Sequence, residues 1–426
     1  MPAPALPSGS DANVLAQTLA FHRDPLVFLR QAQERHGDVF AIRLLTVRPL
    51  FVVAHHAAVE KLLSADPGSA HAGEARRRVL PFASSRSVFG ADAERHRAAR
   101  GRIAVAMSEE AMSRHRPEIA RIAARHASEW PKGRPFRLLP RIRTLTDEIF
   151  VRLVLGVRDE EPARALVAAI RRMLWTPGNP PLTLPGPGDG VAGRLGEALF
   201  ERRQAPVAQL LVSAVEARRS ERSERVDVLG CMVGATPPLS SEEIVDELMS
   251  LLMAAQEPPA IALGWLLDLL GREPELARRF AENPRSELSA ALVREVLRLQ
   301  PPASGVLRRL TEPLEVDGRR ALPAGATTLV PTSLLHRDPR IHEDPDRFWP
   351  QRWMGTQTVG PYFPFGGGAR RCIGEPLARA EIEAGLPAVL EQIQLMPLSG
   401  RPERMVQRAT VLVPRRGLMV RAREVS

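Results

Sequence analysis

The chain has few cysteines, few lysines and few aromatic residues for a length of 426 residues. Two cysteines, Cys231 and Cys372, are too few to hold a small secreted fold together through disulfide bonds. The first residues contain neither a basic segment nor an apolar run of the length that a signal peptide needs. We therefore expect a reducing, cytoplasmic location.

The sequence also lacks an uninterrupted apolar run of membrane-spanning length. Two adjacent prolines and three polar side chains interrupt the longest apolar stretch, residues 248–270. A membrane helix needs about 20 predominantly apolar residues and rarely contains charged ones. This stretch therefore predicts a buried helix and no membrane partner.

Charge and aromatic content bear on nucleic-acid binding. The 59 basic and 49 acidic residues give a net charge of +10, but Lys61 and Lys132 are the only lysines. Tyr362 is the only tyrosine, and aromatic residues make up 4% of the chain, so platforms on which bases could stack are scarce. An acidic protein partner explains the positive charge better than a nucleic acid does.

Hydrophobic periodicity predicts a mainly α fold with small β-sheets. We expect one domain over residues 1–426, with a short flexible N-terminus over residues 1–15 and no fused reductase. Helices are predicted at residues 24–36, 58–65, 110–130, 145–155, 162–174, 190–220, 241–270, 274–281, 285–299 and 376–392. Strands are predicted at residues 39–45, 50–54, 326–331 and 417–422. Residues 176–190 are rich in proline and glycine, which predicts a mobile surface loop that could act as a lid.

The most informative cysteine is Cys372. It follows a glycine-rich turn at residues 366–368 and precedes Pro376, a residue that commonly opens a helix at its first turn. Backbone N–H groups of such a turn, together with Arg370 and Arg371, favour a thiolate over a thiol. Cys372 is therefore a candidate metal ligand or nucleophile, although a lone cysteine beside a glycine turn is more often an inert buried residue.

The spacing around this cysteine carries a resemblance. The segment Phe365-Gly-x-Gly-x-Arg370-x-Cys372-x-Gly374 resembles the haem-binding signature of the cytochrome P450 family, position for position. Upstream, Glu295-Val-Leu-Arg298 is similar to the ExxR element of that family, and residues 348–353, FWPQRW, resemble the segment that follows it.

The ExxR resemblance also has a physical reading. Glu295 and Arg298 lie three residues apart and share a helix face, so they can form a charge-assisted network with Arg352. A lone ExxR would be a weak signal, because solvated ion pairs at this spacing are common.

The resemblance implies a cytochrome P450 fold that binds haem b through an axial Cys372 thiolate, which favours O–O bond cleavage. It implies monooxygenation, such as hydroxylation, of a secondary metabolite that is a small molecule or a peptide. Electrons would come from NAD(P)H through ferredoxin and ferredoxin reductase, and a monomer is expected.

The resemblance also implies the residues that contact the haem. His96 and Arg100, whose spacing of four residues would place them on one face of a helix, match the pair that meets the haem propionates in the family, with Arg308 and Arg370 as further contacts. Phe365 would shield the sulfur ligand, and Gly374 completes the signature. Without the resemblance, His96 and Arg100 would simply suggest a polar helix surface.

The predicted long helix departs from the family pattern at residues 254–259. Pro258 occupies the place of the threonine whose hydroxyl ordinarily helps to deliver protons, while Glu257 keeps the acid. Pro258 and Pro259 also lack N–H donors, so the carbonyls of Ala254 and Ala255 lose their helical partners. These four candidate catalytic residues, Ala254, Ala255, Glu257 and Pro258, could hold an ordered water that serves as a proton path, or the prolines could only reshape the pocket.

The missing alcohol leaves other reactions open. Oxidative coupling of aryl, phenol or peptide groups, and desaturation, use the same haem chemistry without oxygen rebound. A catalytically silent haem protein that recruits a bound substrate is a further alternative, because a fold does not guarantee an activity.

Overall fold

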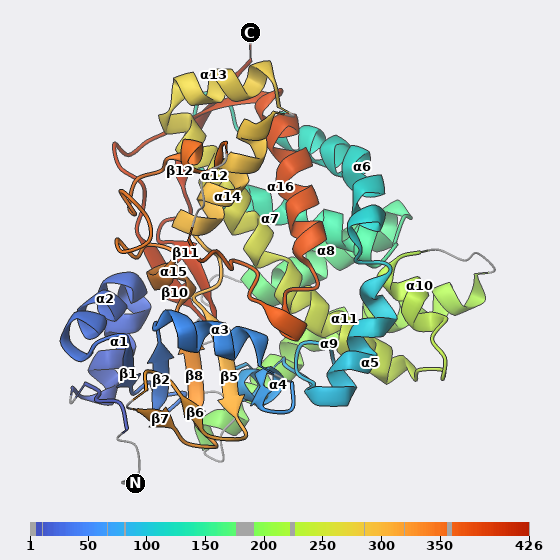
Figure 1. Ribbon diagram of the computed structural model, residues 1–426. Helices are drawn as coiled ribbons and strands as arrows, with labels where there is room; N and C mark the ends of the chain where they lie inside the picture. The colour runs from blue at the N-terminus through green and yellow to red at the C-terminus, as the bar shows by residue number, and fades with distance from the viewer. Residues whose placement is uncertain are drawn as a thin grey trace.

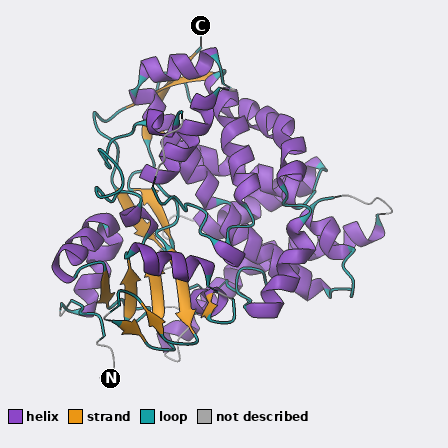
Figure 2. Cartoon of the chain, in the orientation of Figure 1, coloured by secondary structure: helices purple, strands orange, loops and turns teal. Residues whose placement is uncertain are grey.

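The computed structural model describes residues 6–10, 12–65, 67–80, 82–175, 191–221, 226–284, 286–318, 320–355 and 360–425. A small sheet region with the first two helices lies on one side, and a larger helical region forms the rest (Figures 1 and 2). The predicted access loop at residues 176–190 falls outside the described residues.

The first half of the chain alternates short strands with helices. Its elements are α1 (Val14–Arg23), α2 (Pro25–His36), β1 (Val39–Ile42), β2 (Leu50–Val53), α3 (His56–Ser64), β3 (Ala70–His71), α4 (Ala72–Arg77), α5 (Ala93–Ala104), α6 (Glu109–Ser128), β4 (Pro135–Arg137), α7 (Leu138–Ile149), the π-helix η1 (Phe150–Val154), α8 (Glu160–Trp175) and α9 (Val191–Ser220). Helix α1 was not predicted from the sequence. The side chain of Asn13 caps α1 by accepting from Leu15 N, and Asp24 caps α2 in the same way.

The second half contains the long core helices and most of the remaining strands. Its elements are α10 (Val228–Val233), α11 (Ser241–Ala255), α12 (Glu257–Arg272), α13 (Pro274–Glu282), α14 (Glu287–Leu299), β5 (Val306–Leu310), β6 (Leu314–Glu315), β7 (Ala321–Leu322), β8 (Thr327–Val330), α15 (Thr332–Leu335), the 3₁₀ turns η2 (Pro350–Trp353) and η3 (Gly368–Arg370), α16 (Glu375–Leu390), β9 (Ile393–Pro397), β10 (Met405–Arg408), β11 (Val411–Pro414) and β12 (Met419–Glu424).

The largest sheet has the strand order β1-β2-β8-β5-β3. Strand β2 pairs in parallel with β8, while the other neighbours in this sheet are antiparallel. Strand β5 therefore lies between β8 and the short strand β3, which leads directly into α4. This order places strands from the first 80 residues beside strands that come after residue 300.

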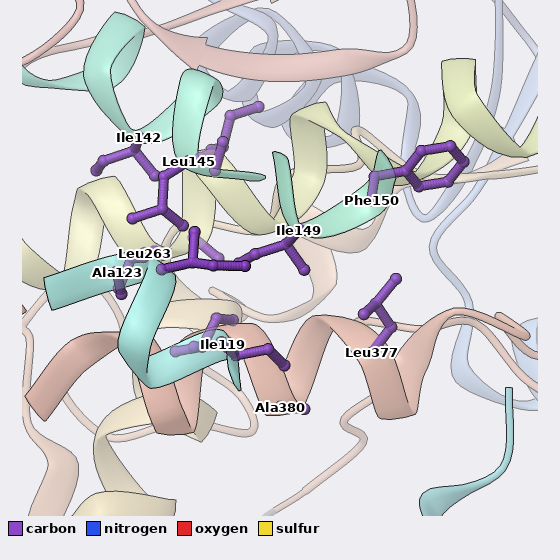
Figure 3. Close-up of a cluster of buried hydrophobic side chains, with 14 of the residues drawn as sticks. Ile119, Ala123, Ile142, Leu145, Ile149, Phe150, Leu263, Leu377 and Ala380 are labelled. Atoms are coloured by element: carbon purple, nitrogen blue, oxygen red, sulfur yellow. The ribbon is translucent and has the colours of Figure 1, made fainter. Parts of the chain in front are cut away.

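The main core forms where α6, α7, α12 and α16 pack together (Figure 3). On α7, Ile142, Leu145 and Ile149 recur at helical spacing and are completely buried. They face Ile119 of α6 and Leu263 of α12 within one continuous cluster. This packing fixes α12 and α16, the two helices that flank the candidate site.

The prediction of a single helix over residues 241–270 was wrong. Helix α11 ends at Ala255, Gln256 serves as the boundary residue, and α12 begins at Glu257. Pro258 and Pro259 lie in the first turn of α12, where a missing N–H costs nothing because that donor has no helical partner. The prolines thus start a new helix, which explains the break.

The expected fold class is confirmed, whereas the extent of a single domain over residues 1–426 stays a prediction. The expectation of a flexible segment over residues 1–15 does not hold throughout, because Gly9 forms a β-bridge with Ala41 and α1 already begins at Val14. The protein is mainly α with small β-sheets, and nearly all predicted helices and strands have counterparts within a few residues. Among the residues that the structure describes, no helix is long and apolar enough to cross a membrane.

Candidate functional site

Cys372 lies in a tight loop between η3 and α16. The backbone N–H of Cys372 donates to the carbonyl of Phe365 at 2.9 Å, and the N–H of Gly366 donates to the carbonyl of Phe363 at 2.9 Å. Gly366 and Gly368 adopt positive φ angles of 70° and 61°. A Cβ atom on Gly368 would lie 2.2 Å from the carbonyl oxygen of Leu63, so this turn requires glycine.

The local electrostatics around the Cys372 sulfur partly contradict the sequence argument. The side chain is solvent-accessible, yet the protein atoms around it desolvate the thiolate and raise the pKa of the thiol. The N–H of Gly374 and the charges of Arg76 and Arg100 act in the opposite direction but do not outweigh this desolvation. Turn donors alone therefore do not make Cys372 a thiolate, whereas coordination to a metal ion would.

Five basic side chains from four segments converge near Cys372. His96 and Arg100 come from α5, Arg308 from β5, Arg370 from η3 and Arg76 from α4. The structure thus brings together the four residues that the sequence analysis proposed for the propionates.

Burial and mutual repulsion both change the pKa values of these groups. Burial lowers the pKa of His96 to about 4, and the charges of Arg370, Arg100 and Arg76 contribute to this lowering. Burial likewise lowers the pKa of Arg308 to about 9, with repulsion from Arg76 and Arg370. Four guanidinium groups and a neutral imidazole therefore share one partly desolvated region.

Asp92 is the acid that partly balances this cluster. Its carboxylate pairs with Arg370 and also accepts from the backbone N–H groups of Gly73 and Glu74, both at 2.7 Å. Arg370 still has two buried nitrogen atoms, Nε and Nη1, without a hydrogen-bond partner among the described residues. A dianionic group such as a pair of carboxylates would satisfy these donors and relieve the repulsion.

Arg76 is the member of this cluster that the sequence analysis missed. It lies in the basic run Arg76–Arg78, which has no motif that separates one arginine from the next. In the structure its guanidinium donates to the carbonyl of Phe89 at 3.0 Å and lies 4.3 Å from the centre of the Phe89 ring. Only the packing of α4 against β5 places this residue near the cysteine.

The predicted network around Glu295 is confirmed by its geometry. Both Glu295 and Arg298 are completely buried and form two hydrogen bonds of 2.8 Å, and Arg352 Nε donates to Glu295 at 3.1 Å. The Trp349 N–H and the Trp353 indole N–H also donate to the same carboxylate, at 2.9 and 2.8 Å. Five donors therefore hold one buried carboxylate beneath the cysteine loop.

The helix break places the other candidates beside α7. Glu257 is buried, and both its oxygens pair with the guanidinium of Arg143, with Nε to Oε2 at 2.9 Å. Burial raises the pKa of Glu257, while Arg143 opposes this shift. Arg143 was not predicted as a site residue, because no local pattern links α7 to residue 257. Ala254, Ala255 and Pro258 are only partly buried.

Comparison with known proteins identifies the family. The family model described as cytochrome P450 matches residues 7–422. This chain is a cytochrome P450. The putative cytochrome P450 135B1 of Mycobacterium tuberculosis (strain ATCC 25618 / H37Rv) is 31% identical over 435 residues, covering 98% of this chain and 91% of that protein. The putative cytochrome P450 138 of Mycobacterium bovis is 29% identical, covering 98% and 96%.

Solved structures of P450s share the fold. Retinoic acid-bound cyanobacterial CYP120A1 matches with a TM-score of 0.84 at 22% identity, covering 99% of this chain and all of that one. A mutant of P450 EryK in complex with erythromycin B matches with a TM-score of 0.73 at 23% identity, covering 94% and 98%. As a member of this family the protein binds haem b and belongs to the haem-thiolate monooxygenases.

Proposed function

We propose that this P450 oxidises a secondary metabolite, and that the sulfur of Cys372 would bind the haem iron. The observation that carries the proposal is the accessible sulfur of Cys372 beside a cluster of four arginines, of which Arg370 pairs with the nearby acid Asp92. No group of three or more His, Cys, Asp or Glu side chains among the described residues could hold a metal ion, so a single-thiolate site suits this chain better than a multi-ligand one.

The surrounding residues have separate roles in this proposal. Arg100, Arg308, Arg370 and Arg76 would bind the propionates, because their positive charge matches two carboxylates, and the neutral imidazole of His96 would donate a hydrogen bond to them. Phe365, which is partly buried against the core, would cover one side of the sulfur, and Gly374 donates its N–H to the sulfur. Bound haem supplies the activation of dioxygen at the thiolate-ligated iron.

Proton delivery must differ from the usual acid–alcohol arrangement. Pro258 has no hydroxyl group, and the Glu257 carboxylate is held by Arg143. The carbonyls of Ala254 and Ala255 lie in the last turn of α11, where helix carbonyls have no helical donor. Water on these carbonyls, or a hydroxyl group of the substrate, would therefore bring the proton.

The lack of a hydroxyl group at Pro258 favours a second candidate reaction. Oxidative coupling or desaturation removes hydrogen atoms without transferring oxygen to the substrate, and therefore fits a pocket without the usual alcohol. We keep monooxygenation as the first choice, because the haem-thiolate family as a whole performs it.

Electrons would arrive at the outer face of the cysteine loop. A recess of about 300 Å³ lies there, and its lining includes Phe365, Arg371, Arg379 and Arg294. Arg371 pairs with Glu375 and Arg379 pairs with Glu383, both acids of α16. The side chain of Arg294 is exposed to solvent. An acidic ferredoxin, reduced by NAD(P)H through ferredoxin reductase, fits this basic rim.

Turnover with a surrogate ferredoxin and ferredoxin reductase tests the proposal. Candidate small molecules and peptides are first screened for binding spectra, and the products of those that bind are identified by mass. A gain of one oxygen atom would support monooxygenation, and a loss of two hydrogen atoms would support coupling or desaturation. Binding without any product at full reduction of the haem would instead favour the silent haem protein.

A further inference from the structure

The imidazole of His336 contacts the cysteine loop directly. His336 follows α15 and is completely buried. Its Nε2 atom accepts a hydrogen bond from the backbone N–H of Phe363 at 3.0 Å. The ring also stacks on Tyr362 at 5.4 Å and meets the Phe363 ring edge-on at 4.9 Å, measured between ring centres.

The hydrogen bond defines the protonation state of His336. An amide N–H can donate only to an unprotonated Nε2 atom, so the proton of the neutral ring lies on Nδ1. Burial lowers the pKa of His336 to about 3, and the nearby His342 and Arg298 lower it further. The ring is therefore neutral at neutral pH and remains an acceptor for Phe363 there.

His336 joins two parts of the site that are otherwise separate. On one side, Nη1 of Arg298 donates to the carbonyl of His336 at 2.8 Å, which ties this residue to the buried Glu295 network. On the other side, the carbonyl of Phe363 accepts from the N–H of Gly366. The carbonyl of Phe365, two residues after Phe363, accepts from the N–H of Cys372. A continuous set of hydrogen bonds and short backbone segments thus runs from Arg298 to the sulfur-bearing residue.

We propose that His336 is a positioning residue for Cys372, because it fixes the start of the loop that carries this cysteine. The proposal rests on the role of Cys372 proposed above. Without an acceptor, the Phe363 N–H would be buried and unpaired, so the loop would rotate to expose or re-pair it. That rotation would shift Gly366 and Phe365, and with them the hydrogen bond that orients Cys372.

Two amide substitutions separate this role from general packing. Glutamine places its amide where Nε2 lies in histidine, whereas asparagine is one methylene shorter and ends near the position of Nδ1. His336→Gln therefore retains an acceptor for Phe363, and His336→Asn removes it while introducing the same polar group. His342→Asn is the matched control, because His342 is also buried and lies near Arg298 and Arg352, but no described hydrogen bond joins it to the cysteine loop.

The readouts are the ferrous-CO spectrum and the reduction potential at equal haem content. We expect His336→Asn to lower the ratio of the red-shifted thiolate band to the thiol-type band by roughly fivefold or more, the size of effect that an unpaired buried amide gives. His336→Gln and His342→Asn should retain the ratio and the potential of the parent. If His336→Asn does not fold, the spectrum of His336→Gln still tests the positioning role of His336, because loss of its thiolate band would overturn the proposal.

Two further outcomes would contradict the proposal. One is a parent-like spectrum and potential in His336→Asn, and the other is an equal change in His342→Asn. If the assignment of Cys372 as the haem ligand were wrong, the result would differ from both of these outcomes. The parent itself would then show no thiolate band, or Cys372→Ala would retain it.

Discussion

Replacing Glu295 with alanine removes the carboxylate that five donors share. Arg298 would retain the carbonyls of His336, Pro345 and Arg347 as acceptors, but its charge would have no buried counter-ion. Arg352, which is 5% exposed, would likewise keep the carbonyls of Glu343 and Asp344 as acceptors but lose its counter-ion. Breaking a buried ion pair from one side costs about 3–5 kcal/mol, and we expect Glu295→Ala to lower the free energy of unfolding by that amount.

The chain provides a control with the same local geometry. Glu275 and Arg278 are also three residues apart on a helix and form two hydrogen bonds, of 3.1 and 2.6 Å, but both side chains are exposed. Solvent screens such a pair, so Glu275→Ala should leave stability almost unchanged. Urea unfolding followed by circular dichroism, together with the haem content of the purified protein, measures both variants. Equal midpoints for Glu275→Ala and Glu295→Ala, or full haem loading and parent stability in Glu295→Ala, would refute the reasoning.

Three other predictions concern pH, proton delivery and haem binding. Burial raises the pKa of Glu247 to about 7, so the folded state retains a proton that the unfolded chain has already lost above about pH 4.5. This contribution to stability is complete below about pH 4.5 and is lost as the pH rises through 7, and Glu247→Gln should therefore be more stable than the parent at pH 8 but not at pH 4. Pro258→Thr restores an alcohol beside the acid, and should increase product per NAD(P)H and lower peroxide release with surrogate substrates, with a small effect on the native one. Arg76→Leu should weaken haem retention, whereas Arg78→Leu in the same basic run should not, because Arg78 is exposed and paired with Glu74.

Each of these predictions has a result that would contradict it. A stability difference between Glu247→Gln and its parent that does not change between pH 4 and pH 8 would exclude the ionisation argument. Tight coupling of the parent with surrogates that lack a hydroxyl group, unchanged in Pro258→Thr, would show that the prolines only shape the pocket. Equal rates of haem transfer to apomyoglobin from the Arg76 and Arg78 variants would remove Arg76 from the haem site.

The sequence predicted the fold well where a local pattern determines the structure. Helix α2 and strand β2 follow from hydrophobic spacing and from end signals that lie within a few residues of each other. The prediction of one helix over residues 241–270 was wrong for an equally local reason, because it treated Pro258 and Pro259 as interruptions inside a helix. They are typical first-turn residues, and recognising this would have predicted the break at Gln256.

The candidate site was predictable as far as the motifs extend. The glycine turn and the ExxR element lie in continuous segments, so Cys372 and the Glu295 network could be proposed in advance. Arg76 and Arg143 could not, because each reaches its partner through long-range packing of helices that share no sequence pattern with the site. The direction of the Cys372 pKa also depends on the desolvation that the complete fold produces.

The ferrous-CO spectrum of the cysteine variants tests the central claim most directly. The parent should show the red-shifted Soret band of a thiolate-ligated haem, Cys372→Ala should lose it, and Cys231→Ala should retain it. Cys231 is a suitable control because it is the other cysteine in the chain and lies in α10, where burial raises the pKa of its thiol. Loss of the band in Cys231→Ala and its persistence in Cys372→Ala would contradict the account.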